Sequence, residues 1–555
     1  MNTKTKSVEV LPLVKYYIDE LKLPQMFDKY IPNTNRAQIP ASQVLSLMIM
    51  NIVTSSKPLY RVEDWLHDYL DGITEASINS AKYNDDRLGR NLDYLFDADR
   101  ASLLAELSAH AISLHKLETH EIHNDSTSIT FMGAYENENH SAAQITYGYN
   151  KDHRPDCKQL VFGLNITADG HVPLSYEVYD GNQADVSTHT SNWENLRKLL
   201  NTETFIYIAD SKLCSVANLT TIDENGGLFI TVVPRNFSEI KAFLNRVSEG
   251  EEIDWHYQYQ TPDSRKKDRT QDYQIHEGEQ MTNGYRILWI HSQAKEKLEC
   301  KAREKRIIKA EQALERLSSG LNRYKLKTRE QIEKAVKKAC KGASCYLSVT
   351  LEEEISIDRV PVGRGKPGPS TRYTNKEVIS YQLKWTRNEQ EVSQAQRTDG
   401  LFPLADNTDL EPVKVLQTYK DQPYLEKRFC TKKSVLEIAP VFLKNPERIE
   451  AMVCLYFIAL MIVSLIERRI RKEMQEQKIV SLPMRPAGMH TKKPTWQTIV
   501  DSFHGVHLAM IEESGQVIHT ALKGLNALRR QILELLKVPV TIYTKLLDRW
   551  WEFAT

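Results

Sequence analysis

The sequence lacks the features of a secreted, disulfide-stabilised or zinc-binding protein. Its cysteines are odd in number and scattered, and no Cys-x-x-Cys pair occurs among positions 157, 214, 300, 340, 345, 430 and 454. This pattern is typical of reduced thiols and argues against a disulfide framework or a structural zinc site. The first residues, MNTKTK, have no apolar stretch of the kind found in a signal peptide. We therefore expect a cytoplasmic protein.

Long hydrophobic runs and an excess of one charge are also missing. The longest apolar run, 451–466, is shorter than the roughly 20 residues of a membrane span, so we expect a buried helix and no membrane contact. The 73 Lys and Arg residues balance the 73 Asp and Glu residues. Any surface for nucleic acid must therefore be local. With 555 residues the chain exceeds one hydrophobic core and should form several domains.

Periodicity predicts five regions. Residues 1–118 carry helical spacing, as at Leu11, Val14 and Ile18 before Pro24, and predict a helical domain that either only packs or binds DNA ends. Strand patterns follow in 119–234, with hairpin strands at 159–167 and 172–179 and a helix at 193–200. The remaining regions are an insertion module (235–395), a segment returning to the core (396–470) and a helical C-terminal region (471–555). The fold class is α/β, with a mixed sheet flanked by helices.

The insertion module contains a strongly basic predicted helical hairpin, broken at Ser318–Gly320. Between positions 295 and 341 there are sixteen Lys or Arg and seven Glu residues, an excess of nine positive charges. A solvated helix with i,i+4 ion pairs is one interpretation. We favour an arm that follows the DNA phosphate backbone, with candidate contacts at Lys301, Arg303, Lys305, Arg306 and Lys309.

Two strand-like segments carry an acid where an apolar residue is expected. Asp125 lies in the middle of 121–131, and Asp210 ends the apolar run 205–210. Burying even a neutral polar group without a partner costs roughly 2–7 kcal/mol, and an ionised carboxylate costs more. The two acids therefore predict a shared metal site. His120 and His123 flank Asp125 and suggest zinc as an alternative, but without further spaced ligands we interpret them as strand-face residues.

A third acid, Glu426, follows a predicted helix that starts with a capping box at Thr408–Glu411. Tyr419, Glu426 and Lys433 recur every seven residues and Gln422 lies four before Glu426, so all share one helical face, with Pro423 interrupting the helix. An aromatic ring, an amide, an acid and a lysine on one stripe would suit a phosphodiester and its metal ions.

These residues resemble a known signature. The pattern Tyr-x2-Arg-x3-Glu-x6-Lys marks a branch of bacterial insertion-sequence DDE transposases with an RNase H-like catalytic core, and this chain has Gln422 at the arginine position. The resemblance covers about residues 10 to 470. It includes the segments 124–127, 151–156, 181–182, 208–210, 399–400, 440–442 and 448–449.

The resemblance implies a transposase that cleaves DNA at the ends of its element and joins them to target DNA. Its catalytic and metal-binding triad would be Asp125, Asp210 and Glu426, holding two Mg²⁺ ions for which Mn²⁺ can substitute. Its partners would be the terminal inverted repeats, the target duplex and a second subunit in a homodimeric synaptic complex. The implied DNA-binding residues are Tyr419, Gln422, Lys433, Lys151, Arg154 and Lys158.

Three other functions are compatible with parts of the sequence. An RNase H-like nuclease would use the same triad without joining strands, but it leaves the insertion and the helical front region without a purpose. A catalytically idle DNA-binding derivative conflicts with the intact acids. An interaction scaffold built on 295–341 leaves the buried acids unexplained.

Overall fold

The structure is a computed structural model that describes residues 2–31, 39–69, 80–133, 135, 141–151, 154–202, 204–262, 270–323, 326–362, 368–369, 371–421, 443–513 and 516–554. Three predicted site residues, Gln422, Glu426 and Lys433, lie outside these ranges. The described residues divide into two compact units. The first comprises Met1–Thr231, Asn407–Asp409 and Gln417–Thr555, and the second Val232–Asp406 and Leu410–Leu416.

The first unit begins with a strand and then a series of helices. The elements are β1 (Asn2–Ser7), α1 (Leu11–Glu20), α2 (Leu23–Tyr30), α3 (Ala41–Thr54), η1 (Leu59–Arg61), α4 (Val62–Asp68), η2 (Ser80–Lys82), α5 (Asp85–Asp97) and α6 (Arg100–His115). Two details differ from the sequence prediction. Pro24 lies in the first turn of α2, where its missing N–H has no intrahelical partner to lose. The predicted all-helical start is wrong at β1, which is a strand because β13 supplies its hydrogen-bonding partner.

A mixed sheet forms the centre of this unit. Its strands are β2 (Glu121–Phe131), β3 (Lys158–Thr167), β4 (Pro173–Tyr179), β5 (Ile206–Ala209) and β6 (Leu228–Val232), in the order β4-β3-β2-β5-β6. β2, β3 and β4 are antiparallel neighbours, whereas β5 is parallel to both β2 and β6. The crossovers contain η3 (Asp185–Thr188), α7 (His189–Leu200) and α8 (Val216–Glu224). The predicted mixed sheet flanked by helices is confirmed.

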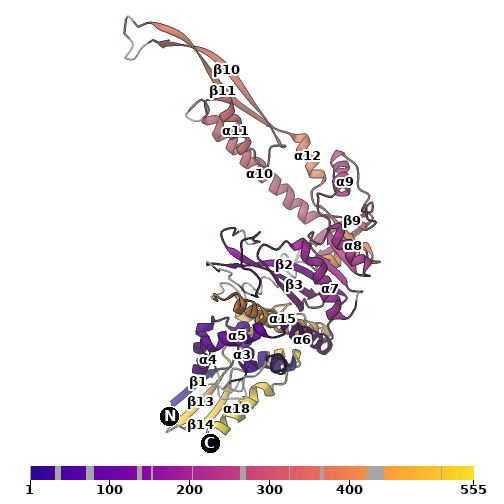
Figure 1. Cartoon of the computed structure of the whole chain (residues 1–555), viewed down its shortest axis with the longest axis vertical. Helices are drawn as coiled ribbons and strands as arrows, with labels where there is room; N and C mark the ends of the chain where they lie inside the picture. Colours follow the sequence, from indigo (N-terminus) through magenta and orange to yellow (C-terminus); the bar gives the residue numbers. More distant parts are fainter. Residues whose placement is uncertain are drawn as a thin grey trace. The chain divides into compact units, whose positions relative to one another are not determined.

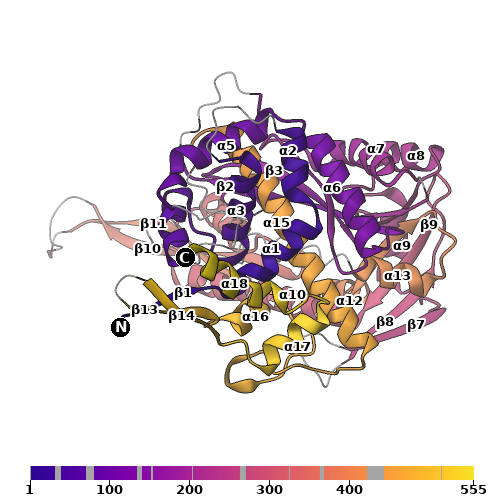
Figure 2. The ribbon, with the colours of Figure 1, turned by 90° about the horizontal axis from the view of Figure 1, so that it is seen from below.

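The long helix α15 (Pro446–Glu476) runs through the first unit against α3, α5 and β4 (Figure 2). Arg448 near its start forms a bidentate pair with Asp93 of α5, and the ring of Phe457 lies 4.9 Å from that of Tyr176 in β4. In the part of the chain that the structure describes, α15 alone is long and apolar enough to cross a membrane, but 83% of its most apolar stretch is buried. It is longer than the predicted run, and its burial is that of a core helix.

The end of the chain contains more than the predicted helices. After α15 come η5 (Pro486–Gly488), α16 (Trp496–Phe503), β13 (His507–Glu513), β14 (Gln516–Lys523), α17 (Ala527–Leu535) and α18 (Thr541–Ala554). β13 pairs with both β14 and β1, so strands from the two ends of the chain share one small sheet. The all-helical prediction for 471–555 is wrong here, because a pairing between distant segments leaves little local signal.

The second unit combines an antiparallel sheet with a long two-stranded ribbon. The sheet order is β12-β9-β8-β7. Figure 1 shows the ribbon of β10 and β11 extending past the helices α10 and α11. The elements are α9 (Ser238–Glu249), β7 (Tyr257–Pro262), β8 (Thr270–Glu277), β9 (Arg286–Ser292), α10 (Gln293–Ser319), α11 (Arg329–Ala339), β10 (Leu347–Pro361), β11 (Tyr373–Arg387), α12 (Glu389–Arg397), β12 (Leu401–Asp406) and α13 (Pro412–Lys420), whose last residues belong to the first unit.

The basic helical hairpin is present, but one of its candidate DNA contacts is buried. α10 ends at Ser319 with Gly320 as its C-cap, as predicted. Arg303 is 4% exposed and makes two hydrogen bonds to the carboxylate of Asp399, at 2.8 and 2.5 Å. Its proposed phosphate contact is therefore wrong, because the guanidinium is needed to neutralise a buried acid. Lys301, Lys305 and Lys309 are exposed and follow one another at four-residue steps along α10.

Candidate active site

The register of two parallel strands brings the first two acids together. β2 and β5 pair His123 with Ile208, so two residues further along Asp125 comes level with Asp210. Paired residues of neighbouring parallel strands point to the same face of the sheet, about 5 Å apart. Asp125 and Asp210 accordingly line one small cavity. The structure thus brings together two of the three predicted catalytic acids.

The carboxylate of Asp125 is held by the residue after it and by a lysine from a loop. Its Oδ1 accepts a hydrogen bond from the backbone N–H of Ser126 at 2.7 Å and lies 3.3 Å from Nζ of Lys151. The same ammonium donates to the backbone oxygen of Ser126 at 2.6 Å and to its hydroxyl at 3.0 Å. The oxygens of Asp125 and Ser126 thus form a position that favours a positively charged group.

Asp210 is fixed by a turn and by the neighbouring strand. Its Oδ1 accepts from the backbone N–H of Lys212 at 2.9 Å, and its backbone oxygen accepts from the hydroxyl of Thr231 in β6 at 2.8 Å. The four residues of β5 are buried, and their packing holds the strand in register up to Asp210, which follows it.

Burial disfavours the charged form of Asp125. Desolvation and, to a smaller extent, the negative charge of Asp210 raise its pKa to about 6, against the opposing effect of the ammonium of Lys151. An acid destabilised in this way gains more than an exposed acid from any cation that binds it. A carboxyl whose pKa is shifted and which shares a cavity with a second carboxyl is a candidate functional group.

A buried network of side chains lies behind the acids. The amide of Asn124 donates to Asn165 at 2.9 Å, Asn165 and Asn192 exchange hydrogen bonds, and Asn192 donates to the hydroxyl of Tyr207 at 2.8 Å. Nδ1 of His189 lies 3.1 Å from the same hydroxyl. A buried network of this kind fixes the strands and the first turn of α7 relative to one another.

The loop that carries Lys151 is held by close backbone contacts. A Cβ on Gly148 would lie 2.0 Å from the backbone oxygen of Gly181, and one on Gly181 would lie 2.0 Å from that of Gln159. Only glycine fits at these two positions. The side-chain amide of Gln159 donates to the backbone oxygen of Gly181 at 2.7 Å and closes the arrangement. Residues 148 and 181 therefore shape the loop.

The other predicted DNA-binding residues are dispersed. Arg154 pairs with Asp156 on the surface, and Nζ of Lys158 donates to the backbone oxygen of Tyr135 at 2.8 Å. Tyr419 is half-buried near the end of α13. His123 is fully buried within β2 and does not line the cavity. Among the described residues, which exclude Glu426, no group of three His, Cys, Asp or Glu side chains is placed to bind a metal.

Sequence analysis did not identify the residues that complete the cavity wall. These come from β4, from the end of η3 and from the start of α7, and they are Tyr179, Thr188, His189 and Asn192. The predicted helix began at Trp193, whereas α7 begins at His189. The residues at 187–192 are polar and have no apolar periodicity, so the sequence does not mark them as helical. Only the Ser and Thr residues there, which are common at helix starts, could have indicated that the helix begins before Trp193.

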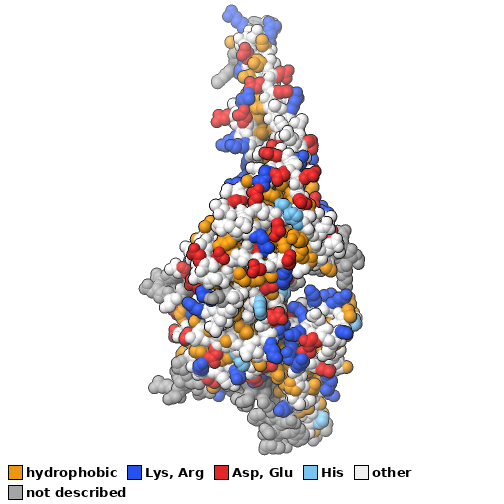
Figure 3. All heavy atoms as spheres, turned by 90° about the vertical axis from the view of Figure 1, so that its right-hand side faces the viewer, with side chains coloured by type: hydrophobic (Ala, Val, Ile, Leu, Met, Phe, Trp, Pro, Cys, Tyr) orange, Lys and Arg blue, Asp and Glu red, His pale blue; other side chains and the backbone are white. Residues whose placement is uncertain are grey.

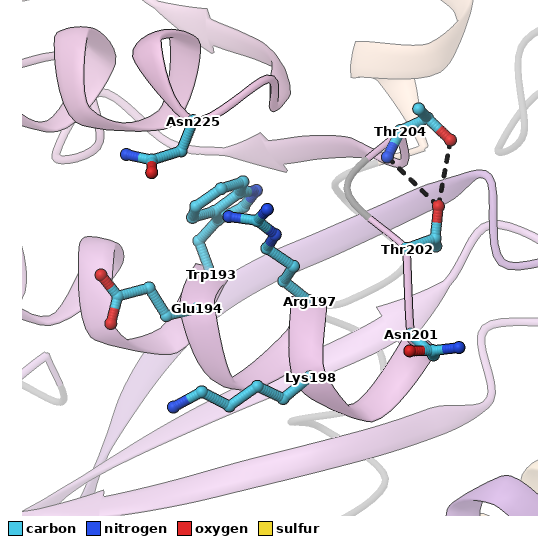
Figure 4. Close-up of a pocket in the computed structure, with 8 residues that line it drawn as sticks. All are labelled: Trp193, Glu194, Arg197, Lys198, Asn201, Thr202, Thr204 and Asn225. Carbon is cyan, nitrogen blue, oxygen red and sulfur yellow. Dashed lines mark hydrogen bonds between the residues drawn. The ribbon is translucent and has the colours of Figure 1, made fainter.

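A larger and more open hollow lies at the other end of α7 (Figure 4). Figure 4 shows Arg197 beside Trp193, and the guanidinium carbon is 5.6 Å from the ring centroid. The hollow also contains Lys198, which suggests a phosphate. However, it adjoins the negative end of the helix dipole and Glu194, both of which disfavour an anion. The smaller cavity with the two acids is therefore the better candidate for chemistry.

Comparisons with known proteins identify one domain and several distant structures, two of which are transposase complexes. Residues 3–109 match a domain of unknown function, DUF4277, and no curated protein matches the chain. The structure of the piggyBac transposase synaptic complex with hairpin DNA aligns over 100% of this chain and 88% of that chain, at 9% identity and a TM-score of 0.38. The Mos1 transposase paired-end complex aligns over 37% of this chain and 63% of that chain, at 10% identity and a TM-score of 0.15. These scores are too low to assign a function.

The raised pKa of Asp125 predicts a pH-dependent effect of its removal. The folded state holds a proton on Asp125 up to about pH 6, whereas the unfolded chain releases it near pH 4, so stability falls as the pH rises through this window. Asp125→Asn should increase the free energy of unfolding by about 2–3 kcal/mol near pH 7.5 and by about half of this near pH 5. Urea unfolding at the two pH values measures the difference.

The matched control is Asp156→Asn. Arg154 bonds to this exposed acid and lowers its pKa, so its replacement should give no gain in stability at either pH. An equal effect of Asp125→Asn at both pH values would contradict the assigned burial cost.

Proposed function

We propose that the chain is a DDE transposase that performs metal-dependent phosphoryl transfer on DNA. The observation that supports this most is the pairing of Asp125 and Asp210 at one level of neighbouring parallel strands, in a cavity where burial raises the pKa of Asp125. Two acids placed in this way, one of them strongly desolvated, are costly to keep, and a cation between them would reduce the cost. Glu426 is proposed as the third ligand from its position in the Tyr419-to-Lys433 signature.

The residues present fit a hard divalent cation. Carboxylate oxygens of Asp125 and Asp210 face one cavity, and the hydroxyl and backbone oxygens of Ser126 already hold the ammonium of Lys151. Mg²⁺ prefers such oxygen ligands and retains several waters, and Mn²⁺ accepts the same set. When bound, a pair of these ions activates an attacking oxygen and stabilises the leaving oxygen of an in-line displacement.

The protein's own groups orient the DNA and the acids. Asp125 and Asp210 are held by Ser126 N–H and Lys212 N–H, so their carboxylates need little rearrangement to bind cations. A cation bound at Asp125 would replace the contact of Lys151 with this carboxylate, and the ammonium, still held by Ser126, would then be available to the scissile phosphate. The buried network from Asn124 to His189 keeps the cavity wall fixed while the charge on the reacting phosphate changes.

Strand transfer, rather than hydrolysis alone, requires a hold on the cut end. Hydrolysis frees a 3′-hydroxyl, and a protein that keeps this hydroxyl in place can direct it at a second phosphodiester. We assign this task to Tyr419, Gln422 and Lys433, by stacking and phosphate contact. The N-terminal helices and the exposed lysines of α10 would supply further DNA contacts in this function.

Strand transfer by the purified chain is the direct test of this function. With Mg²⁺, the wild-type chain should join a pre-cut duplex end that bears a 3′-hydroxyl, taken from the inverted repeats beside its gene, to a target duplex. Asp210→Asn and Glu426→Gln should abolish both cutting and joining, because each removes a ligand. Lys433→Ala should impair joining and end binding more than metal binding. Gel analysis of labelled DNA reports each product.

Asp156→Asn serves as the control, since this exposed acid pairs with Arg154 and Cys157 of its own loop. It should retain both reactions. A chain that nicks DNA but never joins any end of its own element would be a nuclease. A chain that binds these ends without cutting or joining them would be an idle derivative. Either result overturns the proposal.

The exposed stripe of α10 predicts a change in the salt dependence of DNA binding. Replacing Lys301, Lys305 and Lys309 with Gln should weaken binding to all sequences alike. It should also reduce the slope of log affinity against log salt by about 0.9 for each phosphate that the protein no longer neutralises. The matched control replaces Lys241, Lys376 and Lys384, which are exposed elsewhere in the second unit. Equal slopes for the two variants would show that α10 makes no specific backbone contact.

A further inference from the structure

The ribbon of the second unit carries its leucines and isoleucines on one face. These side chains are buried near the base of the ribbon and exposed further out. β10 and β11 pair in register from Leu347–Arg387 to Pro361–Tyr373, and we call this ribbon the arm. Residues directly opposite each other in such a pair point to the same face. Near its base, Leu347, Leu351 and Leu383 on this face pack against the core formed by α10 and α11.

The same face continues beyond the helices without a covering. Beyond the row of Glu353 and Tyr381, this face carries Ile355 opposite Ile379, then Ile357 opposite Glu377, and near the tip Tyr373. The side chains of Ile355 and Ile357 are 63% and 66% exposed, and those of Ile379 and Tyr373 are each 48% exposed. Figure 3 shows hydrophobic side chains at the surface of the arm between charged ones.

This exposure needs a physical explanation. A two-stranded ribbon is marginally stable in water unless one face packs on something else. Large apolar side chains gathered on one exposed face mark an interaction surface rather than ordinary surface variation. The opposite face carries Ser348, Thr350, Glu352 and Lys384, so the leucines and isoleucines of the arm lie on the side that packs on the helices at the base.

The charge of the arm favours protein over DNA as the partner. Its two strands contain the acids Glu352, Glu353, Glu354, Asp358 and Glu377, against the bases Arg359, Lys376, Lys384 and Arg387. A surface that follows phosphates needs a clear excess of positive charge, which these two strands do not have; the bases Arg364, Lys366 and Arg372 come between the strands in the sequence. Its exposed isoleucines would bury little against a phosphate backbone.

We propose that the exposed face of the arm packs against the same face of a second copy of this chain. The two arms lie antiparallel, and the two-fold axis passes between the row of Ile355 and the row of Ile357. Ile355 of each copy therefore faces Ile357 of the other copy. The same axis sets Glu353 opposite Arg359, one row further out on each side. On the second strand the same axis sets Ile379 opposite Glu377 of the second copy. The complementarity in shape and in charge that an isologous interface requires is therefore provided by the β10 strands. Two ribbons packed in this way keep their own pairing and cover isoleucines that are otherwise exposed.

Sedimentation or light scattering of the full chain without DNA measures this association and does not depend on the proposed function. The wild type should form dimers as concentration rises. Ile355→Lys with Ile357→Lys should weaken dimerisation by about tenfold or more, because it puts charge into the apolar contact. The matched control, Ser356→Lys with Thr374→Lys, adds the same charge to the opposite face and should dimerise as the wild type does.

A charge exchange tests the arrangement itself. Glu353→Arg and Arg359→Glu should each weaken dimerisation, and the double variant should restore it. Circular dichroism checks that each variant is folded, since Glu353 also pairs with Arg329. A wild type that is monomeric at every concentration overturns the proposal. Equal weakening of dimerisation in the isoleucine variant and the control variant also overturns it, as does a double charge exchange that does not restore dimerisation. The same holds for an isoleucine variant that fails to bind DNA while it still dimerises.

Discussion

The candidate site depends on the register of one parallel strand pair. A shift by one residue between β2 and β5 would turn one acid to the opposite face of the sheet and separate the two carboxylates. The register is set by buried side chains, since Ile122, Tyr207 and Ile208 are fully covered. Packing energy therefore holds together two like charges that repel each other. The raised pKa of Asp125 reflects mainly the burial of its carboxyl and, to a smaller extent, this repulsion.

Several features far apart in the sequence support this arrangement. The backbone contacts at Gly148 and Gly181 bring the loop of Lys151 onto β2, where its ammonium partly neutralises Asp125. The network from Asn124 through Asn192 attaches α7 to the sheet. α15 covers the sheet from one side and fixes the N-terminal helices through Arg448 and Asp93. Residues in the other segments that resemble the transposase family, such as Gly181 and Arg448, thus have identifiable structural tasks, apart from any role in chemistry.

Much of the core was predictable because its signals are local. The apolar runs around Asp125 and Asp210 mark their strands, and the turn at Asp169 and Gly170, where glycine adopts a positive φ, marks the β3–β4 hairpin. The features that were missed depend on distant partners. β1 becomes a strand only beside β13, and Arg303 looks like a surface cation until Asp399 is placed against it. The tail of the signature, with Gln422, Glu426 and Lys433, remains a prediction from sequence.

The most direct measurement is cleavage of the polypeptide by Fe²⁺ bound in place of Mg²⁺, in the presence of ascorbate and peroxide. Bound iron generates hydroxyl radicals that cut the backbone near its ligands. If Asp125, Asp210 and Glu426 share one metal site, fragments should end near all three positions, excess Mg²⁺ should suppress them, and Asp210→Asn should remove all three cuts together. Cuts near 125 and 210 without one near 426, or cuts that persist in Asp210→Asn, would contradict a shared three-acid site.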